Sequence, residues 1–269
     1  MTQEVVSTRI SDAQGAADDL VRQLKGSPDS YNAVIFMAAI KYDFAALSAA
    51  IKEKFPNSEV IGASTAGEID LNGFQNDSVV LTTMSDSRTR VKGVLVENGS
   101  KYPVANKADI ERALSAAGIS CGDPNSHRSA FAIAFINGVF NAEETVLSNF
   151  YSIIQNDKFA LAGGTAGFTG SEAKTFVSYN GRTTQDGAAF LFVKTPCRFD
   201  IRQEDIFNPT GKTIYVTKSD TIKRTIYSLN GQRAKTVYAQ QLGVSESQAE
   251  GMTFENPFGR HINGSIHIA

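Results

Sequence analysis

The feature that most constrains the fold of this chain is an internal repeat. The segment IGASTAGEI at residues 61–69 returns as LAGGTAGFT at residues 161–169, and Thr-Ala-Gly takes the same place in both. Each copy reads as a strand, a helix, a second strand, a turn of small residues and two further strands. The repeat predicts two similar units in tandem. Chance similarity between two ordinary α/β units remains the alternative.

Apolar patterning predicts the elements of each copy. The runs AVIFMA at 33–38 and AIAFIN at 132–137 have the length and composition of buried strands. A helix follows each run, capped by Asp43 in the first copy and by Asn141 in the second. Two strands then follow each turn without an intervening helix, which predicts antiparallel pairing. We therefore expect an α/β (α+β) fold with mixed, largely antiparallel sheets and helices on one face of each sheet.

A change in character after Pro196 predicts a domain boundary. Residues 1–200 hold the two similar units, at about 1–120 and 121–200, and residues 201–269 form a third, partial region. Strands are expected there at 198–203 and 213–217, with a helix at 232–242. The chain stops on an apolar, strand-like run, so we expect a domain cut from a longer protein.

Composition excludes several classes of function. The 269 residues carry 26 Lys and Arg against 28 Asp and Glu, so no nucleic acid is expected as a partner. The only cysteines, Cys121 and Cys197, lie too far apart for a CxxC metal site. No signal core and no apolar run of about 18 residues is present, which predicts a cytoplasmic protein without membrane insertion.

Catalytic motifs are incomplete. Residues 62–66 resemble the nucleophile elbow GxSxG, but Ala66 stands in place of the last glycine, and Gly164 replaces Ser64 in the second copy. The segment NPTGKT at 208–213 ends like a phosphate-binding loop, yet Ile206 stands where that motif needs glycine. We therefore expect a protein that is not an enzyme, with neither catalytic residues nor a metal site.

The two Thr-Ala-Gly turns are the best candidate for a binding site. Small residues leave backbone N–H groups open to a ligand, and two facing turns would form a pocket for a carboxylate or a similar polar group. The hydroxyls of Ser64, Thr65 and Thr165 would add donors, and Glu68 would meet a ligand ammonium. The alternative is that glycine and alanine simply fit a crowded crossing between sheets.

The sequence resembles the FIST (F-box and intracellular signal transduction) family of sensory domains. The resemblance is carried by VIGASTAGEI at 60–69, LAGGTAGFTG at 161–170, QDGAAFLF at 185–192, IYSLNGQRAKTVYAQQLG at 226–243 and ENPFGR at 255–260. It spans roughly residues 20–269. Family members usually continue past such a point, so the resemblance implies that the end of the C-terminal part is lacking.

The resemblance implies a cytoplasmic sensor of bacterial signal transduction. Such a domain binds a small, amino-acid-like molecule and passes the signal to a histidine kinase or chemoreceptor-type output protein. The resulting set of ligand-binding residues is Ser64, Thr65, Gly67, Glu68, Gly164, Thr165, Gly167, Asp186 and Arg260.

Two other functions stay open. One branch of the family, the NosP-like branch, is described as haem-binding and nitric-oxide-sensing, and acts on a histidine kinase. If this chain binds haem, His261 and His267 are the first candidates for the axial ligand, and His127, Cys121, Cys197 or a tyrosine are further ones. The other is an interaction scaffold without any ligand.

Overall fold

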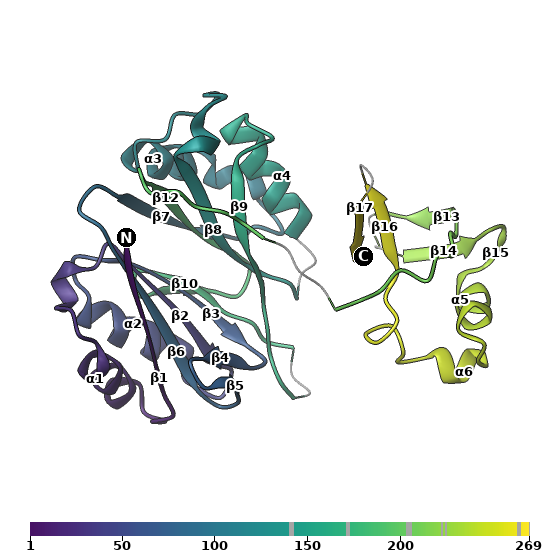
Figure 1. The fold of residues 1–269 in the computed structure, drawn as a ribbon, viewed down its shortest axis with the longest axis horizontal. Helices are drawn as coiled ribbons and strands as arrows, with labels where there is room; N and C mark the ends of the chain where they lie inside the picture. Colours follow the sequence, from purple (N-terminus) through teal and green to yellow (C-terminus); the bar gives the residue numbers. More distant parts are fainter. Residues whose placement is uncertain are drawn as a thin grey trace. The chain divides into compact units, whose positions relative to one another are not determined.

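Figure 1 shows the fold of the computed structural model, which describes residues 1–139, 143–170, 173–202, 206–221, 223, 225–262 and 265–268. Asn141, predicted as a helix cap, lies outside these residues. The chain divides into two compact units, Met1–Arg202 and Gln203–Ala269. Both Thr-Ala-Gly turns belong to the first unit.

The first sheet of this unit combines strands from both copies of the repeat. Its order is β1 (Thr2–Thr8), β6 (Val79–Ser85), β2 (Ala33–Ala39), β3 (Glu59–Thr65), β10 (Val177–Tyr179) and β11 (Arg182–Thr184). β2 and β3 are parallel and are joined by helix α2 (Phe44–Lys54), whereas the other neighbours are antiparallel. Helix α1 (Ala13–Gln23) connects β1 to β2.

The second sheet reproduces the core of the first. Its order is β7 (Arg90–Glu97), β12 (Gly187–Lys194), β8 (Ala130–Asn137) and β9 (Ala160–Ala166). Helix α3 (Lys107–Ala116) connects β7 to β8, and helix α4 (Glu143–Ile154) joins the parallel strands β8 and β9. Directions and order match β1-β6-β2-β3 strand for strand. The repeated unit thus runs from β1 to β6 and again from β7 to β12.

Each copy also contains a short hairpin before its last strand. In the first copy β4 (Glu68–Asp70) pairs with β5 (Gly73–Gln75) in a sheet of their own. In the second copy the equivalent hairpin, β10–β11, adds to the edge of β3 in the first sheet. The copies are therefore interlocked as well as consecutive.

Apolar side chains fill three layers of core. One cluster lies between α1, α2 and the first sheet, and another lies between α3, α4 and the second sheet. A third lies between the sheets, where Ile61 and Val177 of one sheet meet Leu95 and Leu191 of the other. Helices therefore cover one face of each sheet (Figure 1), which confirms the predicted fold class. Strands such as β12 read as continuous apolar runs because both of their faces are buried.

Several details differ from the sequence-based expectation. The consecutive strands β6 and β7 do not pair with each other, because each pairs within its own sheet. A boundary near residue 120 would cut the second sheet from its first strand β7 and from α3. Residues 198–202 are not a strand. β1, the β4–β5 hairpin and β11 were not predicted, whereas a strand at 175–179 was expected and contains β10.

The second unit has a small core around Tyr238, Ala239 and Ala249. Its elements are β13 (Val216–Asp220), β14 (Thr225–Leu229), β15 (Gln232–Arg233), α5 (Ala234–Leu242), α6 (Glu246–Ala249), β16 (Gly259–Ile262) and β17 (Ser265–Ile268). β13, β14 and β15 form one antiparallel sheet, and β16 pairs with β17. Within the described ranges, no helix has both the length and the apolar character needed to cross a bilayer.

Candidate functional site

The two Thr-Ala-Gly turns contact one another directly. The backbone N–H of Gly167 donates to the carbonyl oxygen of Ser64 over 2.8 Å. The hydroxyl of Ser64 in turn donates to the carbonyl oxygen of Gly167 over 2.9 Å. A Cβ atom on Gly167 would lie 2.9 Å from the backbone nitrogen of Ala66, so only glycine allows this approach. At this point the turns are bonded to each other, with no gap between them for a ligand.

Ser64 also bonds a third segment to this junction. Its side chain is completely buried, and its hydroxyl oxygen accepts the backbone N–H of Phe176 over 3.0 Å. The N–H of Ser64 donates to the carbonyl oxygen of Phe176 over 2.9 Å. The end of β3, the second turn and the residues before β10 are therefore held by one serine. In this arrangement the Ser64 hydroxyl has a structural role.

Glu68 is buried in the first turn, with 1% of its surface exposed. One carboxylate oxygen accepts the hydroxyl of Thr65. The other accepts the N–H of Ser78 over 3.1 Å and its hydroxyl over 2.7 Å. These donors compensate the buried charge and hold the β4–β5 hairpin against the start of β6. A ligand ammonium at Glu68 would have to replace them.

The remaining predicted site residues are dispersed. Gly164 and Thr165 are exposed on β9, and open space surrounds Gly164. The carboxylate of Asp186 accepts the N–H of Ser100 over 2.9 Å and its hydroxyl over 2.6 Å. Arg260 belongs to the second unit, exposed on β16. Gly67 packs beneath Phe74 in the first turn, where an added Cβ would lie 2.5 Å from the ring.

A pocket of about 410 Å³ lies beside the junction, and sequence reasoning did not find it. The first copy contributes the loop between β2 and α2, and the second contributes residues that follow its turn. The lining residues are Ile40, Tyr42, Asp43, Phe44, Ala45, Thr169, Lys174 and Phe176. The pocket lies at the carboxyl end of the parallel strand β2, where ligands of α/β proteins commonly bind.

Aromatic rings form the apolar part of this pocket. Phe44 and Phe176 stack with their ring centroids 5.6 Å apart. The hydroxyl of Tyr42 donates to the carbonyl oxygen of Asp77 over 3.4 Å. Burial raises the pKa of Tyr42, and the nearby charge of Glu68 raises it further, so the phenol stays neutral. These rings suit the apolar portion of a small ligand.

The polar part of the pocket carries charges of both signs. Asp43 caps α2, because its Oδ1 atom accepts the N–H of Ala46 over 3.0 Å. The first turn of α2 also presents the partial positive charge of a helix N-terminus. Lys174 adds an ammonium group from the second copy. A carboxylate and an ammonium group on one small molecule would both find opposite charge here.

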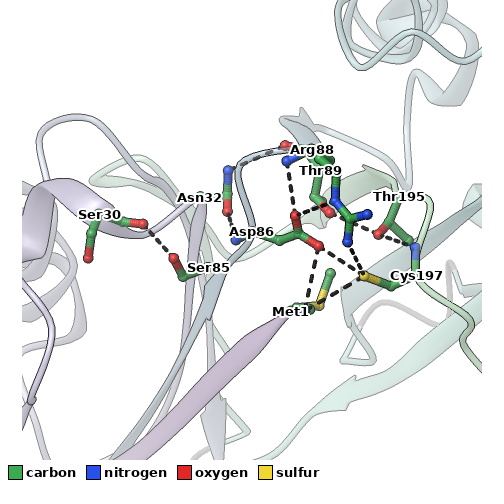
Figure 2. Close-up of polar contacts among 9 residues, drawn as sticks. All are labelled: Met1, Ser30, Asn32, Ser85, Asp86, Arg88, Thr89, Thr195 and Cys197. Carbon is green, nitrogen blue, oxygen red and sulfur yellow. Dashed lines mark hydrogen bonds and ion pairs between the residues drawn. The ribbon is translucent and has the colours of Figure 1, made fainter.

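None of the histidines and cysteines considered as haem ligands is among the described residues that line this pocket. His261 and Cys121 are exposed, and the register of β16 and β17 pairs His261 with Ile266 and His267 with Arg260. The thiol of Cys197 donates to Asp86 over 2.9 Å (Figure 2). Of the side chains considered as haem ligands, a tyrosine, Tyr42, lines the pocket, and its hydroxyl donates to the carbonyl oxygen of Asp77. Among the residues that the structure describes, no group of three or more His, Cys, Asp or Glu side chains is placed to hold a metal ion.

Comparison with known proteins places most of the chain in one family. The FIST N domain matches residues 32–232. Curated protein sequences give no match. Among solved structures, a cyanuric acid hydrolase described as an innovation by structural concatenation aligns with a TM-score of 0.36 and 9% identity, over 71% of this chain and 67% of that one.

A second solved structure gives a similar result. The cyanuric acid hydrolase from A. caulinodans aligns with a TM-score of 0.35 and 11% identity, over 73% of this chain and 71% of that one. Alignments with TM-scores this low bear on neither the fold nor the activity of the chain. The FIST N domain match, by contrast, covers well over half of the 269 residues. The chain belongs to the FIST family of sensory domains.

Proposed function

We propose that this protein is a non-enzymatic sensor that binds a small amino-acid-like molecule in the pocket beside the turns. The observation that carries the proposal is the composition of that pocket. Ile40 and residues 42–45 come from the first copy of the repeat, whereas Thr169, Lys174 and Phe176 come from the second. A ligand there would contact both copies at the point where they are bonded to each other.

The chemistry of the pocket supports a zwitterionic ligand. The ligand carboxylate would lie near the N-terminus of α2 and the ammonium group of Lys174. The ligand ammonium would lie near the carboxylate of Asp43, and its side chain would contact the rings of Phe44 and Phe176. Each of these groups lines the pocket.

Phe176 supports a route for the signal. Its ring lines the pocket, and its backbone N–H and C=O groups both bond to Ser64. A ligand that favours one position of Phe176 would therefore favour one arrangement of the turn junction. An output protein of the histidine kinase or chemoreceptor type, in the cytoplasm, would respond to that difference.

Two neighbouring substitutions on α2 test the location of the site. Ala45 and Ala46 are both exposed in the first turn of the helix, but only Ala45 lines the pocket. We expect calorimetry against a panel of amino acids to find a ligand of the wild-type protein. Ala45→Glu should weaken that ligand at least about tenfold, since the new carboxylate repels the ligand's own. Ala46→Glu, with the same charge change, should leave the affinity unchanged.

Two results would contradict the proposal. The first is the absence of binding by any amino acid, and the second is an equal effect of the two glutamate variants. An absorption spectrum after addition of haemin completes the test. A Soret band of stoichiometric intensity would replace the amino-acid sensor by a haem-based nitric-oxide sensor.

A further inference from the structure

A second pocket of about 410 Å³ lies at the end of the sheets away from the turns. It is lined by Arg88, Arg90, Gly118, Ser129, Lys194, Thr195 and Pro196. Lys194, which lines the pocket, pairs with Ala130 at the start of β8. The second Thr-Ala-Gly turn lies at the other end of this sheet, because it follows the end of β9, opposite Asn137 at the end of β8. We propose that this pocket binds a phosphate-class oxyanion, either free phosphate or a phosphate monoester.

Two cations face each other across adjacent strands in this pocket. Arg90 at the start of β7 lies directly opposite Lys194 at the end of β12. Like charges in this position destabilise an antiparallel pair. When the two Thr-Ala-Gly turns are aligned, the equivalent position in the first copy holds Gln3 opposite Met84, which are uncharged. The fold therefore does not require cations here, and their placement points to an anionic ligand.

Local carboxylates do not compensate these two cations. The nearby carboxylate of Asp86 already has other partners. It lies 3.6 Å from Arg88 and 3.5 Å from the N-terminal ammonium group, and it accepts the thiol of Cys197 (Figure 2). Lys194 donates to the carbonyl oxygen of Gly118 over 2.7 Å. Within the described ranges, neither Arg90 nor Lys194 has a carboxylate at ion-pair distance.

Hydroxyl groups complete the set of donors. Thr195 is buried, and its hydroxyl oxygen accepts the hydroxyl of Thr89 over 2.8 Å and the N–H of Cys197 over 3.1 Å (Figure 2). No described residue accepts the hydrogen of the Thr195 hydroxyl, so it remains available to a ligand. Ser129 adds a second hydroxyl to the lining.

Gly118 makes room for the arginine. It ends α3 in the left-handed conformation, with φ of +78°, and a Cβ atom on it would lie 3.2 Å from an Nη atom of Arg90. The guanidinium group therefore lies over a position that has no side chain. A guanidinium fork, an ammonium group and hydroxyls are the donors that recognise phosphate oxygens. A doubly charged phosphate would offset Arg90 and Lys194 together.

The test compares phosphate with chloride at equal ionic strength. We expect the melting temperature of the wild-type protein to rise with inorganic phosphate and to saturate, since a ligand of the native state stabilises it by mass action. Arg90→Gln and Lys194→Gln should each weaken phosphate at least about tenfold. Arg112→Gln is the matched control, because Arg112 is exposed on α3, pairs with Asp109 and does not line the pocket.

Arg90→Gln has a second expected effect, which separates loss of binding from damage to the fold. In chloride its melting temperature should equal or exceed that of the wild type, because the substitution removes a repulsion. Phenyl phosphate distinguishes the two ligand sources: tighter binding than inorganic phosphate indicates a monoester, and equal binding indicates the free ion. A wild-type protein without a saturable phosphate effect, or an Arg90→Gln variant with an unchanged one, would overturn the proposal.

Discussion

Replacing Ser64 with alanine tests whether this serine joins the two copies of the repeat. The substitution removes the hydrogen bond from the Ser64 hydroxyl to Gly167, at 2.9 Å, and the one from the N–H of Phe176 to the same hydroxyl, at 3.0 Å. Each bond contributes roughly 1 kcal/mol net, and unpaired buried backbone groups add to the loss. We expect the free energy of unfolding to fall by about 2–4 kcal/mol.

Ser48 provides a matched control for that measurement. It is also completely buried, but its hydroxyl has no hydrogen-bond partner in the part of the chain that the structure describes. Ser48→Ala therefore removes an unpaired polar group and should be neutral, or stabilising by up to about 1 kcal/mol.

Urea denaturation followed by circular dichroism measures both variants. Equal losses of stability for Ser64→Ala and Ser48→Ala would refute the role assigned to the Ser64 hydroxyl. A lower m value for Ser64→Ala would instead mean that the two copies no longer unfold together, which would itself show that the junction couples them.

Three further predictions follow from the glycines and one buried phenol. Gly167→Ala should lower the free energy of unfolding by about 1–3 kcal/mol in urea denaturation, because the new Cβ would lie 2.9 Å from a backbone atom. Gly67→Ala should lower it by less than about 1 kcal/mol, because its new Cβ would meet only an exposed aromatic ring. Gly163→Ala should cost about 3 kcal/mol or more, because Gly163 has φ of +152° and the new Cβ would lie 1.8 Å from a carbonyl oxygen. Gly164→Ala should change stability by less than about 0.5 kcal/mol, because the space around Gly164 is open. Burial and a carboxylate partner raise the pKa of Tyr31 to about 12. Its contribution to stability should therefore be constant below about pH 10 and be lost between about pH 10 and 12, so Tyr31→Phe should reduce the alkaline fall in urea titrations. Reversed order within either glycine pair, or an unchanged alkaline fall, would contradict these assignments.

The sequence predicted the parts of the fold whose signal is local. β2 and β8 are largely buried on both faces, with Met37 of β2 exposed, so they read as continuous apolar runs. β1 was missed because it is an edge strand with a mostly polar sequence, TQEVVST. The exchange of β10–β11 into the first sheet could not be predicted, because strand pairing between copies leaves no local pattern.

One signal was present in the sequence and not used. The hairpins β4–β5, β10–β11 and β14–β15 all contain Asn-Gly, at residues 72–73, 180–181 and 230–231. Asn180 has φ of 48° and Gly181 has φ of 83°, as a two-residue hairpin turn requires. Asn-Gly also occurs at 98–99 and 137–138, where no hairpin forms, so the dipeptide indicates a hairpin only when strand-like segments flank it on both sides.

The candidate site was predicted only in part. Small residues at Gly167 and Ser64 indicated a close approach of the two turns, and the structure shows one. At Gly167 the close packing of the two turns explains why the residue is glycine, and no ligand is needed to explain it. The pocket itself depends on Phe44 meeting Phe176, a contact between distant segments that neither segment encodes alone.

The position of β10–β11 has a consequence for biosynthesis. During synthesis the edge of β3 has no paired strand until the second copy has been translated, because β10, the strand that pairs with it, belongs to that copy. An uncovered edge can accept the same hairpin from another molecule. Chains that refold at high concentration would therefore exchange hairpins and form swapped dimers, whereas the covalent linkage of the two copies favours closure within one chain when the protein is dilute.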